Sequence, residues 1–324
     1  MILVIGGFGF VGANTVRALL DLDEACILTQ HKNERLPGFL KEQVGKRIFI
    51  ESLDITDVQT MTALGRKYTI TGIVDLATGG AAVGRDANAL VADLQATIVS
   101  IAAVFQAAQA WGVKRVSLAS APVVYNGLNA LPWREDHPLA MTAAFPMEAV
   151  KKCGELLSSI LSLQTQVESI EMRIGAVYGP NYDTTRSGLV GRLVHEAVNG
   201  AKLGFEGMRF GSAYAADAGD QCYIKDAARA VALLQTADRL NHKVYNVASG
   251  YPTTNQAIVE AIQKVMPEFA AELPVGHMPG LPESAQAWYF DITRLHDDIG
   301  FVPEFDIDSG IADYIAWLQA GNER

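Results

Sequence analysis

The first half of the chain alternates short apolar runs with segments of helical periodicity. The apolar runs are rich in Val, Ile and Leu without strict alternation, and they lie at 2–6, 26–30, 47–51, 72–77, 115–120 and 170–175. Such runs are typical of parallel strands that are buried on both faces. Helical patterns lie between most of them, at 11–22, 57–66, 88–111 and 147–163. This order predicts an α/β fold with a doubly wound parallel sheet and right-handed crossovers.

The character of the sequence changes after Gly179 and Pro180. Residues 179–220 and 250–324 contain more Gly, Pro and turn signals, and their helical patterns are shorter. Between them, "DQCYIKDAARAVALLQ" and "KVYNVAS" are interpreted as a return to the main sheet. We therefore predict one domain from 1–178 together with 221–249, and a smaller C-terminal lobe from 179–220 and 250–324.

Composition limits the classes of partner. Of 324 residues, 49% are hydrophobic and 19% are charged, which is the balance of a globular protein with a sizeable core. The formal net charge of −10 disfavours a nucleic-acid or anionic-membrane partner, because phosphate binding requires clustered Lys and Arg. The apolar stretch "ATIVSIAAVFQAAQAWG" is interrupted by Ser and Gln, which favours a buried or interface helix over a membrane span.

Three cysteines, Cys26, Cys153 and Cys222, are far apart in the sequence. Their spacing shows no metal-ligand pairing, so we predict no metal site. Widely spaced single cysteines are typical of reduced thiols, and we expect a cytoplasmic protein.

Glycines follow the first predicted strand in "VIGGFGFVG". Two dinucleotide templates fit, one with Gly7, Gly9 and Gly12 and one with Gly6, Gly9 and Gly12. Glycine is needed where the backbone turns tightly and where a side chain would block a pyrophosphate. A helix that starts near Phe10 and Val11 would present free N–H groups and a positive dipole end to the phosphates. The motif predicts dinucleotide binding, although glycine in such a turn also has a purely structural explanation.

The end of the second strand bears on which dinucleotide binds. An NAD site usually has a carboxylate there for the ribose hydroxyls, but this strand ends in Gln30, followed by His31, Lys32 and Arg35. A neutral residue with cations nearby tolerates a 2′-phosphate better than a carboxylate does. We therefore expect NADP or NAD as the cofactor, with NADP preferred; the alternative is that the basic residues form a solvated loop.

Several further motifs, taken in order, resemble the extended short-chain dehydrogenase/reductase family, in its NAD-dependent epimerase/dehydratase group. Besides Gly6, Gly9 and Gly12, "LDITD" with Asp54 and Ile55 resembles the adenine-binding segment, and "VDLATGG" with Leu76 and Ala77 resembles the fourth-strand end beside the cofactor. "VYN", "VYGP", "YIKDAARAVALL", "YNVASG" and "FDITRLHDDIGFVPEF" extend the likeness over nearly the whole chain. The resemblance implies a Rossmann-type domain with a substrate lobe.

The resemblance also implies three catalytic side chains, of which one is in place. Lys151, in "FPMEAVKKCGE", matches the family Lys, but Met147 occupies the position of the acid–base Tyr and Ala121 that of the Ser or Thr. Residues 126–177 contain no Tyr, so the loss does not depend on the alignment. Our candidates for catalysis are Lys151, Ser120 and Tyr125. Ser120 precedes the expected position by one residue, so its side chain should point to the other face.

Other groups could replace the missing Tyr, and each has a structural explanation as well. They are Tyr178, Tyr182, His137 and Glu148. Lys151 itself could act as an acid if burial lowers its pKa, or as an anchor for the nicotinamide ribose.

The substrate lobe also departs from the pattern of nucleotide-sugar enzymes. Gly219 and Leu281 lie at about the positions where that group has arginines for the diphosphate. We therefore expect a small-molecule substrate that is smaller, less charged or more apolar than a nucleotide sugar. Candidate pocket residues, which could equally be core, are Trp133, Phe145, Met147, Phe205 and Met208.

Two helices, 88–111 and 147–163, resemble those that form a four-helix dimer interface in the family, and we expect a homodimer. Two function classes stay open. One is an epimerase/dehydratase-like or reductase-like enzyme with relocated acid–base groups; the other is a catalytically inactive NAD(P)-binding sensor or interaction protein.

Overall fold

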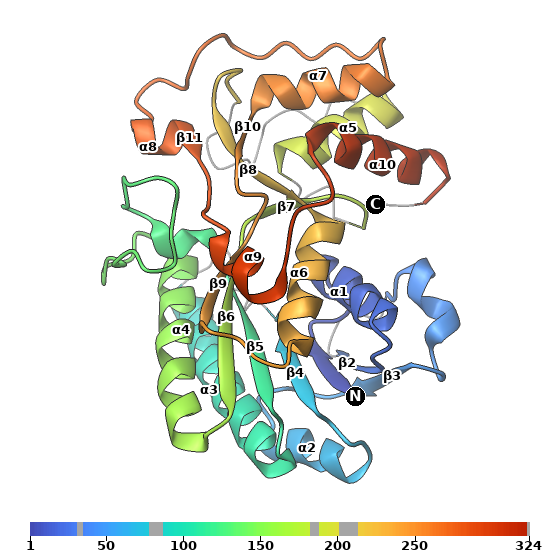
Figure 1. Cartoon of the computed structure of the whole chain (residues 1–324), viewed down its shortest axis with the longest axis vertical. Coiled ribbons are helices and arrows are strands. Elements are labelled where there is room, and N and C mark those ends of the chain that lie inside the picture. The colour runs from blue at the N-terminus through green and yellow to red at the C-terminus, as the bar shows by residue number, and fades with distance from the viewer. Residues whose placement is uncertain (31–34, 78–86, 182–187, 201–212, 323–324) are drawn as a thin grey trace. The chain divides into compact units, whose positions relative to one another are not determined.

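The computed structural model describes residues 1–30, 35–77, 87–181, 188–200 and 213–322, and these residues form two units (Figure 1). Unit 1 contains Met1–Gly127, Pro138–Ile174 and Ala228–Tyr245. Unit 2 contains Leu128–His137, Gly175–Ala227 and Asn246–Arg324. The predicted division into 1–178 with 221–249 is similar, but 128–137 joins unit 2 and the return to unit 1 starts at Ala228.

A seven-stranded sheet dominates unit 1 within the described residues, in the order β3-β2-β1-β4-β5-β6-β9. The pairs from β3 to β6 along this order are all parallel. This topology confirms the predicted doubly wound α/β fold. The strands are β1 (Ile2–Ile5), β2 (Cys26–Gln30), β3 (Ile48–Ser52), β4 (Gly72–Asp75), β5 (Arg115–Ser120), β6 (Glu168–Ile174) and β9 (Val244–Val247).

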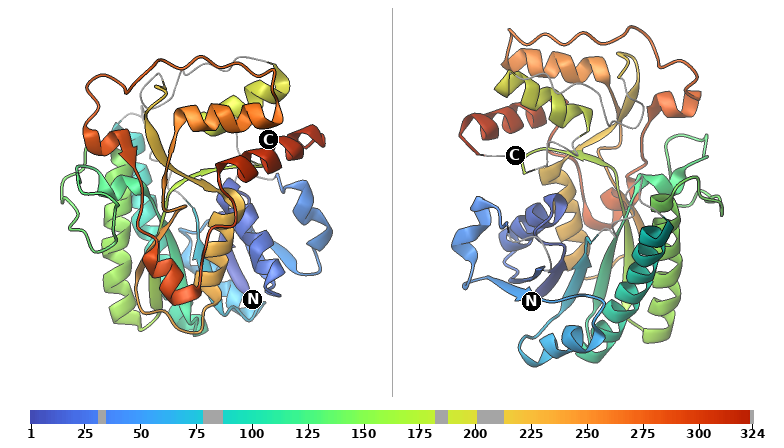
Figure 2. Two further views of the ribbon diagram at one scale, coloured as in Figure 1. Left: turned by 45° about the horizontal axis from the view of Figure 1, so that its top comes forward. Right: turned by 180° about the vertical axis from the view of Figure 1, so that it is seen from behind.

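The helices between these strands also follow the predicted ranges to within two residues. They are α1 (Phe10–Asp21), α2 (Val58–Ala63) with the 3₁₀ turn η2 (Leu64–Arg66), α3 (Ala87–Trp111) and α4 (Pro146–Thr165). Two further 3₁₀ turns are η1 (Gly38–Gln43) and η3 (Pro122–Tyr125). The helices α3 and α4 lie side by side, as Figure 2 shows from behind.

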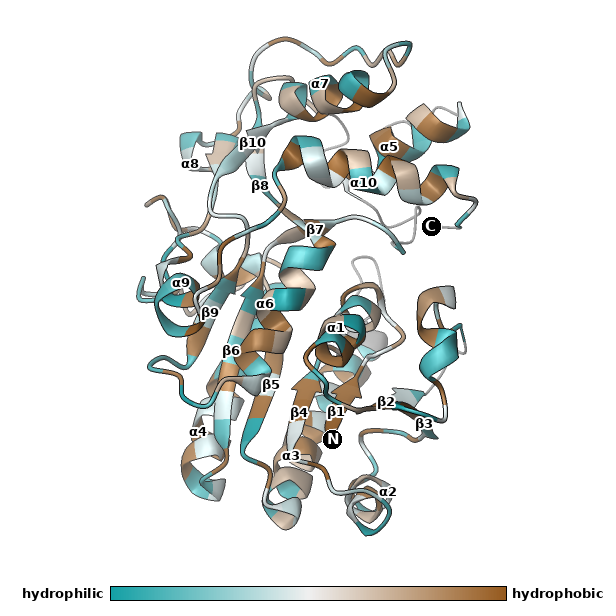
Figure 3. Ribbon diagram, turned by 45° about the vertical axis from the view of Figure 1, so that its right-hand side comes forward, coloured by the Kyte–Doolittle hydropathy of each residue, from teal (hydrophilic) through white to brown (hydrophobic). Residues whose placement is uncertain are grey.

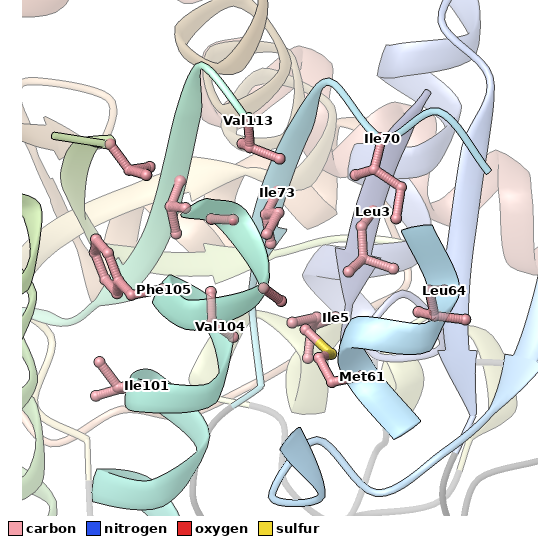
Figure 4. Close-up of a cluster of buried hydrophobic side chains, with 14 of the residues drawn as sticks. Leu3, Ile5, Met61, Leu64, Ile70, Ile73, Ile101, Val104, Phe105 and Val113 are labelled. Carbon is pink, nitrogen blue, oxygen red and sulfur yellow. The ribbon is translucent and has the colours of Figure 1, made fainter. Parts of the chain in front are cut away.

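The core of unit 1 explains why the strand sequences are continuous apolar runs. Figure 4 shows one cluster in which Leu3, Ile5 and Ile73 of the sheet meet Val104 and Phe105 of α3. All five side chains are buried, and Figure 3 shows β1 and β4 as predominantly hydrophobic. Burial of such side chains stabilises the fold by about 1.5–3 kcal/mol each, so this cluster holds α3 against the sheet.

Helix α3 contains the apolar stretch noted in the sequence. By length and composition alone, Val91–Trp111 could cross a membrane. Its residues Ile101, Val104, Phe105, Ala107 and Ala108 belong to the core cluster, as in a core helix of a globular unit. The absence of a membrane partner stays a prediction.

Unit 2 is built around a second sheet, in which β8 (Ala218–Tyr223) pairs with β7 (Ala176–Tyr178), β10 (Pro252–Thr254) and β11 (Ala287–Trp288). The prediction that "DQCYIKD" returns to the main sheet is therefore wrong for its strand, whereas β9 does belong to the main sheet. The strand β8 has the sequence AGDQCY and is largely buried, and burial alone cannot assign a strand to one sheet or the other. The helices here are α5 (Leu189–Asn199), α7 (Asn255–Val265), α8 (Glu283–Gln286), α9 (Thr293–Ile299) and α10 (Ile307–Gln319). Helix α6 (Ile224–Thr236) crosses the boundary between the units.

Candidate cofactor site and active-site helix

The glycine turn between β1 and α1 is fixed by contacts that leave no room for side chains. A Cβ on Gly12 would lie 2.1 Å from the carbonyl oxygen of Gly6, and one on Gly9 would lie 3.2 Å from the same atom. Gly6 has a φ of +79°, which L side chains rarely adopt. The amide of Gly9 donates to the Gly6 carbonyl at 2.9 Å. The turn is therefore closed on itself, and the start of α1 lies directly against it.

The first turn of α1 is suited to an anion. Gly9 is the N-cap, no described side chain caps the helix, and the first turn contains no acidic residue. Helix N-termini carry unsatisfied N–H groups and a positive dipole end. Phe10 and Val11, which start the helix, are half-buried. Together with the glycine contacts, this geometry fits the pyrophosphate of a dinucleotide.

The end of β4 forms the neighbouring wall of the turn. The amide of Leu76 donates to the Ile5 carbonyl at 2.9 Å, and a Cβ on Gly6 would lie 3.0 Å from the amide nitrogen of Ala77. The structure thus brings Leu76 and Ala77 against the glycine turn. Asp75, the last residue of β4, is 7% exposed and accepts a hydrogen bond from the Ala77 amide at 3.0 Å.

The ends of β2 and β3 meet at the segment predicted to lie on the adenine side, and its role there stays a prediction. Gln30 pairs with Ser52, and its carbonyl accepts from the Leu53 amide at 3.1 Å. Asp54 accepts from the Thr56 amide and hydroxyl at 2.9 and 2.7 Å. Ile55 packs on the core cluster. His31 and Lys32 lie outside the described residues, so their predicted role at a 2′-phosphate stays a prediction.

Lys151 lies on α4 with its side chain buried against β5. Its Nζ donates to the Ala119 carbonyl at 2.6 Å, and the residue is 7% exposed. Burial lowers the pKa of Lys151, while the carboxylates of Asp75, Glu171 and Glu155 act in the opposite direction. The structure therefore has a buried amine at the carboxyl end of the sheet, where β4 and β5 end.

The positions of the missing catalytic groups are apolar and half-buried. Ala121 precedes η3, and Met147 lies in the first turn of α4. Neither side chain can donate or accept a proton at neutral pH. The observed geometry thus gives no phenol or hydroxyl at either position.

Ser120 and Tyr125, the two candidate replacements, are both hydrogen-bonded within a buried network in unit 1. The Ser120 hydroxyl donates to Glu155 of α4, and the Tyr125 hydroxyl accepts from Arg173 of β6 at 2.8 Å. The Arg173 guanidinium also lies 4.7 Å from the centre of the Tyr125 ring. Ser120 is 5% exposed and Tyr125 is 1% exposed. Their catalytic roles stay predictions, and this engagement supports a structural role for both.

Arg173 and Glu155 form the centre of that network. Two hydrogen bonds of 2.9 and 2.8 Å join the guanidinium to the carboxylate, and the two side chains are 4% and 12% exposed. Burial would lower the pKa of Arg173, but the hydrogen bonds to Glu155 and Tyr125 outweigh it and raise that pKa. Nearby on β6, Glu171 receives a hydrogen bond from Ser158, and burial raises its pKa to about 8. Glu171 is therefore mostly protonated at neutral pH.

The other proposed acid–base groups lie in structural arrangements. Glu148 is 1% exposed and accepts from Lys152, from Asn126 at 2.9 Å and from the Ala144 amide at 2.9 Å. Tyr178 belongs to unit 2, where burial raises its pKa. His137 accepts from the Arg134 amide at 3.3 Å, also in unit 2. Tyr182, Phe205 and Met208 lie outside the described residues.

An aromatic cluster occupies the part of unit 2 around Gly219. The rings of Trp133 and Trp288 stack with centroids 5.6 Å apart, and Phe290 contacts both edge-on. A Cβ on Gly219 would lie 2.6 Å from the Trp288 ring. Asp220, the next residue of β8, is buried and accepts from the amide and hydroxyl of Ser249. Gly219 is therefore required by Trp288, and the strand has no space for an arginine at this position.

The sequence alone did not identify Asp75, Glu155, Glu171 or Arg173. Each is a charged residue on a buried strand or on the inner side of α4, and a charge beside apolar neighbours is the signal by which they could have been found. A charged residue in such a place needs a partner: Glu155 is bonded to Arg173, and Lys151 acts on Asp75. Among the described residues, no group of three or more His, Cys, Asp and Glu side chains could hold a metal ion.

Comparison with known proteins agrees with this geometry. The family model described as "NAD dependent epimerase/dehydratase family" matches residues 2–248. Among curated proteins, UDP-glucose 4-epimerase of Mus musculus is 20% identical over 98% of this chain and 96% of that protein. A dTDP-glucose 4,6-dehydratase of an Actinoplanes species is 22% identical over 98% of each.

Solved structures show the same fold. UDP-glucose 4-epimerase of Thermotoga maritima, with UDP-glucose, has a TM-score of 0.81 at 18% identity and covers 99% of both chains. The dTDP-glucose 4,6-dehydratase of Bacillus anthracis, in complex with NAD, has a TM-score of 0.79 at 18% identity, covering 98% of this chain and 96% of that one.

The fold and the glycine turn define a Rossmann-type dinucleotide-binding protein of the extended short-chain dehydrogenase/reductase class. The chain belongs to the NAD dependent epimerase/dehydratase family. This membership confirms the resemblance on which the sequence interpretation relied.

Proposed function

We propose that this protein is an NAD(P)-dependent epimerase/dehydratase-like or reductase-like enzyme that acts on a small substrate other than a nucleotide sugar. The observation that carries the cofactor part is the glycine turn, in which Gly6, Gly9 and Gly12 each meet backbone where a Cβ would be. A bound dinucleotide would supply hydride transfer. Lys151 would hold the nicotinamide ribose, and the first turn of α1 would hold the pyrophosphate.

Lys151 is also our candidate for moving the proton. It is buried, its pKa is lowered by burial, and its amine is held at 2.6 Å by the Ala119 carbonyl. A buried lysine with a lowered pKa exchanges protons more readily near neutral pH than an exposed one does. Ser120 and Tyr125 stay secondary candidates, because Glu155 and Arg173 already engage their hydroxyls.

The substrate proposal is supported by the surroundings of Gly219. The UDP-glucose and dTDP-glucose relatives act on substrates with a diphosphate, and a diphosphate calls for bidentate cations. Here the ring of Trp288 lies over Gly219, and Leu281 takes the second position at which an arginine is expected. Stacked Trp133 and Trp288 offer aromatic surface instead, which suits a less charged substrate.

We also propose a homodimer formed through α3 and α4. Outside the core, α4 exposes Leu156, Ile160 and Leu163, which are spaced at one helical face, and α3 exposes Val91 and Ile98. Apolar side chains gathered on two adjacent helices favour burial against a second copy. Light scattering coupled to size exclusion should give twice the chain mass, and Leu156→Glu with Leu163→Glu should give a monomer. A cytoplasmic location is proposed from the free cysteines Cys26, Cys153 and Cys222.

A second function is favoured by Met147 and Ala121 themselves. Two apolar, half-buried residues at the acid–base positions suit a protein that binds the dinucleotide without turnover, as a sensor or interaction protein. The enzyme is preferred because the chain covers its enzymatic relatives over nearly their full length.

Titration calorimetry with NAD, NADH, NADP and NADPH tests the cofactor proposal. We expect dissociation constants below the millimolar range for at least one pair, with NADP(H) tighter, and loss of binding in Gly12→Ala. If none of the four nucleotides binds at millimolar concentration, the cofactor proposal is contradicted. If NAD(H) binds tenfold more tightly than NADP(H), the NADP preference is contradicted.

Ligand specificity and turnover need separate measurements. UDP-glucose and dTDP-glucose should not bind at millimolar concentration and should not be converted, so tight binding of either contradicts the substrate proposal. Isotope exchange with a panel of small hydroxy and keto compounds should detect turnover that is lost in Lys151→Met. Complete inactivity against the panel with intact cofactor binding would favour the sensor.

A further inference from the structure

Asp75 connects the glycine turn to the end of β4. Its Oδ1 accepts the Ala77 amide at 3.0 Å, and the Ala77 nitrogen is the atom that a Cβ on Gly6 would meet at 3.0 Å. The carboxylate therefore fixes the backbone segment against which the glycine turn rests. Loss of this acceptor would leave the Ala77 amide free to turn away from Gly6.

The same carboxylate lies on the strand next to the one that holds the Lys151 amine. In the parallel pair of β4 and β5, Asp75 is opposite Leu118, and the next carbonyl, that of Ala119, accepts the Lys151 amine at 2.6 Å. Both Asp75 and Lys151 are 7% exposed, so solvent screens the interaction between their charges only weakly. Their mutual attraction is the largest single charge effect on Lys151.

The other carboxylates around Lys151 are not available to balance its charge. Glu155, on the same helix, is held by two hydrogen bonds to Arg173. Glu171, on β6, is mostly protonated at neutral pH because burial raises its pKa to about 8. Arg173 faces these two acids rather than Asp75. Among the described acidic groups that act on Lys151, Asp75 is ionised at and above neutral pH, and the cation that acts on it is Lys151.

We propose that Asp75 is a positioning residue of the cofactor site, which holds the Leu76–Ala77 segment beside the glycine turn and balances the charge of the Lys151 ammonium. This inference rests on the proposed function, because it assigns Asp75 to a site that binds NAD(P). A buried ammonium that loses its counter-charge gives up its proton at a lower pH.

The pH dependence of cofactor binding provides a readout that a purely structural role would not move. Burial raises the pKa of Asp75 to about 6, so the carboxylate is charged at and above neutral pH. The protonated amine of Lys151 offers three donors, one of which Ala119 uses, and its charged hydrogen bonds to ribose hydroxyls are stronger than those of the neutral amine. Binding should therefore weaken on the alkaline side, where that proton is lost. Without the Asp75 charge, this alkaline limb should move to lower pH by about one unit or more.

The test measures the dissociation constant of the preferred reduced cofactor, NADH or NADPH, by fluorescence from pH 5.5 to 9.5. The variants are Asp75→Asn, which keeps the shape, and Lys151→Met, which removes the titrating amine. Glu51→Gln serves as the control, because Glu51 on β3 is bonded to Lys67 and Tyr68 and is not among the charges acting on Lys151.

We expect Asp75→Asn to bind the cofactor about tenfold more weakly at the pH where the wild-type affinity starts to fall. Lys151→Met should bind weakly with no alkaline limb, and Glu51→Gln should follow the wild type. If Asp75→Asn has the wild-type profile, the inference is wrong while cofactor binding stands. If the wild type binds neither cofactor, the proposed function has failed instead.

A second variant covers the case in which Asp75→Asn does not fold. Asp75→Ser offers a hydroxyl to the Ala77 amide without a negative charge, and Asp75→Glu keeps the charge. Circular dichroism at each pH identifies the folded samples. The inference is supported if the alkaline fall in affinity moves to lower pH in Asp75→Ser and returns towards the wild-type pH in Asp75→Glu. It is overturned if the affinity falls at the same pH in both variants.

Discussion

The glycine turn and the region around Lys151 are held in shape by different kinds of interaction, although both lie in unit 1. In the turn, the shape is dictated by backbone contacts: Gly12 meets the Gly6 carbonyl and Gly6 meets Ala77. Around Lys151, the shape depends on buried charged side chains that satisfy one another. Backbone-defined sites tolerate almost no change, because the only fitting residue is glycine. A side-chain network can keep the fold while losing groups such as the acid–base Tyr.

Removing one member of the buried ion pair should have the largest effect on stability. Arg173→Met leaves the Glu155 carboxylate buried without its partner, and we expect the free energy of unfolding to fall by about 3–5 kcal/mol. Urea denaturation measures it. The matched control is Arg17→Met on α1, whose pair with Asp21 is more than half exposed, and it should change stability by less than about 1 kcal/mol.

The double variant Arg173→Met with Glu155→Met sharpens this test. Replacing both buried charges with apolar side chains should recover most of the lost stability, since the cost lies in the unpaired charge. Equal losses in the single and double variants would mean that packing, rather than charge, holds α4 against β6.

The glycine turn should respond in binding more than in stability. Gly12→Ala places a Cβ 2.1 Å from the Gly6 oxygen, so the turn must open, and we expect cofactor affinity to fall about 100-fold, or about 2.7 kcal/mol. Calorimetry measures the affinity. Gly38→Ala in η1 is the control, because no atom lies within 4 Å of its Cβ, and wild-type affinity in Gly12→Ala would contradict the assigned role of the turn.

Glu171 should make stability depend on pH. Its folded pKa of about 8 lies above the ordinary value of 4.5, so the folded protein binds more protons between these values and stability falls as pH rises through this window. Glu171→Gln should remove this fall and be more stable than the wild type at pH 9. Thermal denaturation from pH 5 to 9 tests it; parallel curves for the two proteins would rule out a buried, titrating Glu171.

The smallest expected effect comes from restoring the family residues. Met147→Tyr with Ala121→Ser changes two half-buried positions and leaves the glycine turn untouched, so cofactor affinity should stay within about threefold of the wild type. A loss beyond tenfold would show that the two regions are coupled. Stopped-flow absorbance of NAD(P)H with candidate substrates then shows whether a phenol at 147 adds turnover.

The sequence predicted the parts of the molecule that depend on local pattern. Continuous apolar runs identified the parallel strands, and the glycine spacing placed the turn between β1 and α1. Asp54 and Lys151 were predicted from motifs that resemble those of the family, and both roles stay predictions. These features need only neighbours in sequence, and their element bounds agree to within two residues.

The rest depends on contacts between distant segments. The strand β8 has the sequence AGDQCY, which gives no local signal for either sheet, so its place in the second sheet followed only from its pairing with β7, β10 and β11. The engagement of Ser120 by Glu155 joins residues 35 positions apart, and that of Tyr125 by Arg173 joins residues 48 apart. Asp75 passed unnoticed because one acidic residue at a strand end has no periodicity to mark it.

The packing of Trp288 on Gly219 constrains the order in which substitutions can accumulate. An arginine at position 219 would meet the Trp288 ring at 2.6 Å, so the tryptophan must first be replaced by a smaller residue. Each change taken alone loses packing or creates a clash, and only the pair together opens a place for a cation. A laboratory selection for an arginine at position 219 would therefore pass through an intermediate that is less stable than either end, which makes this pair of residues hard to change by single steps.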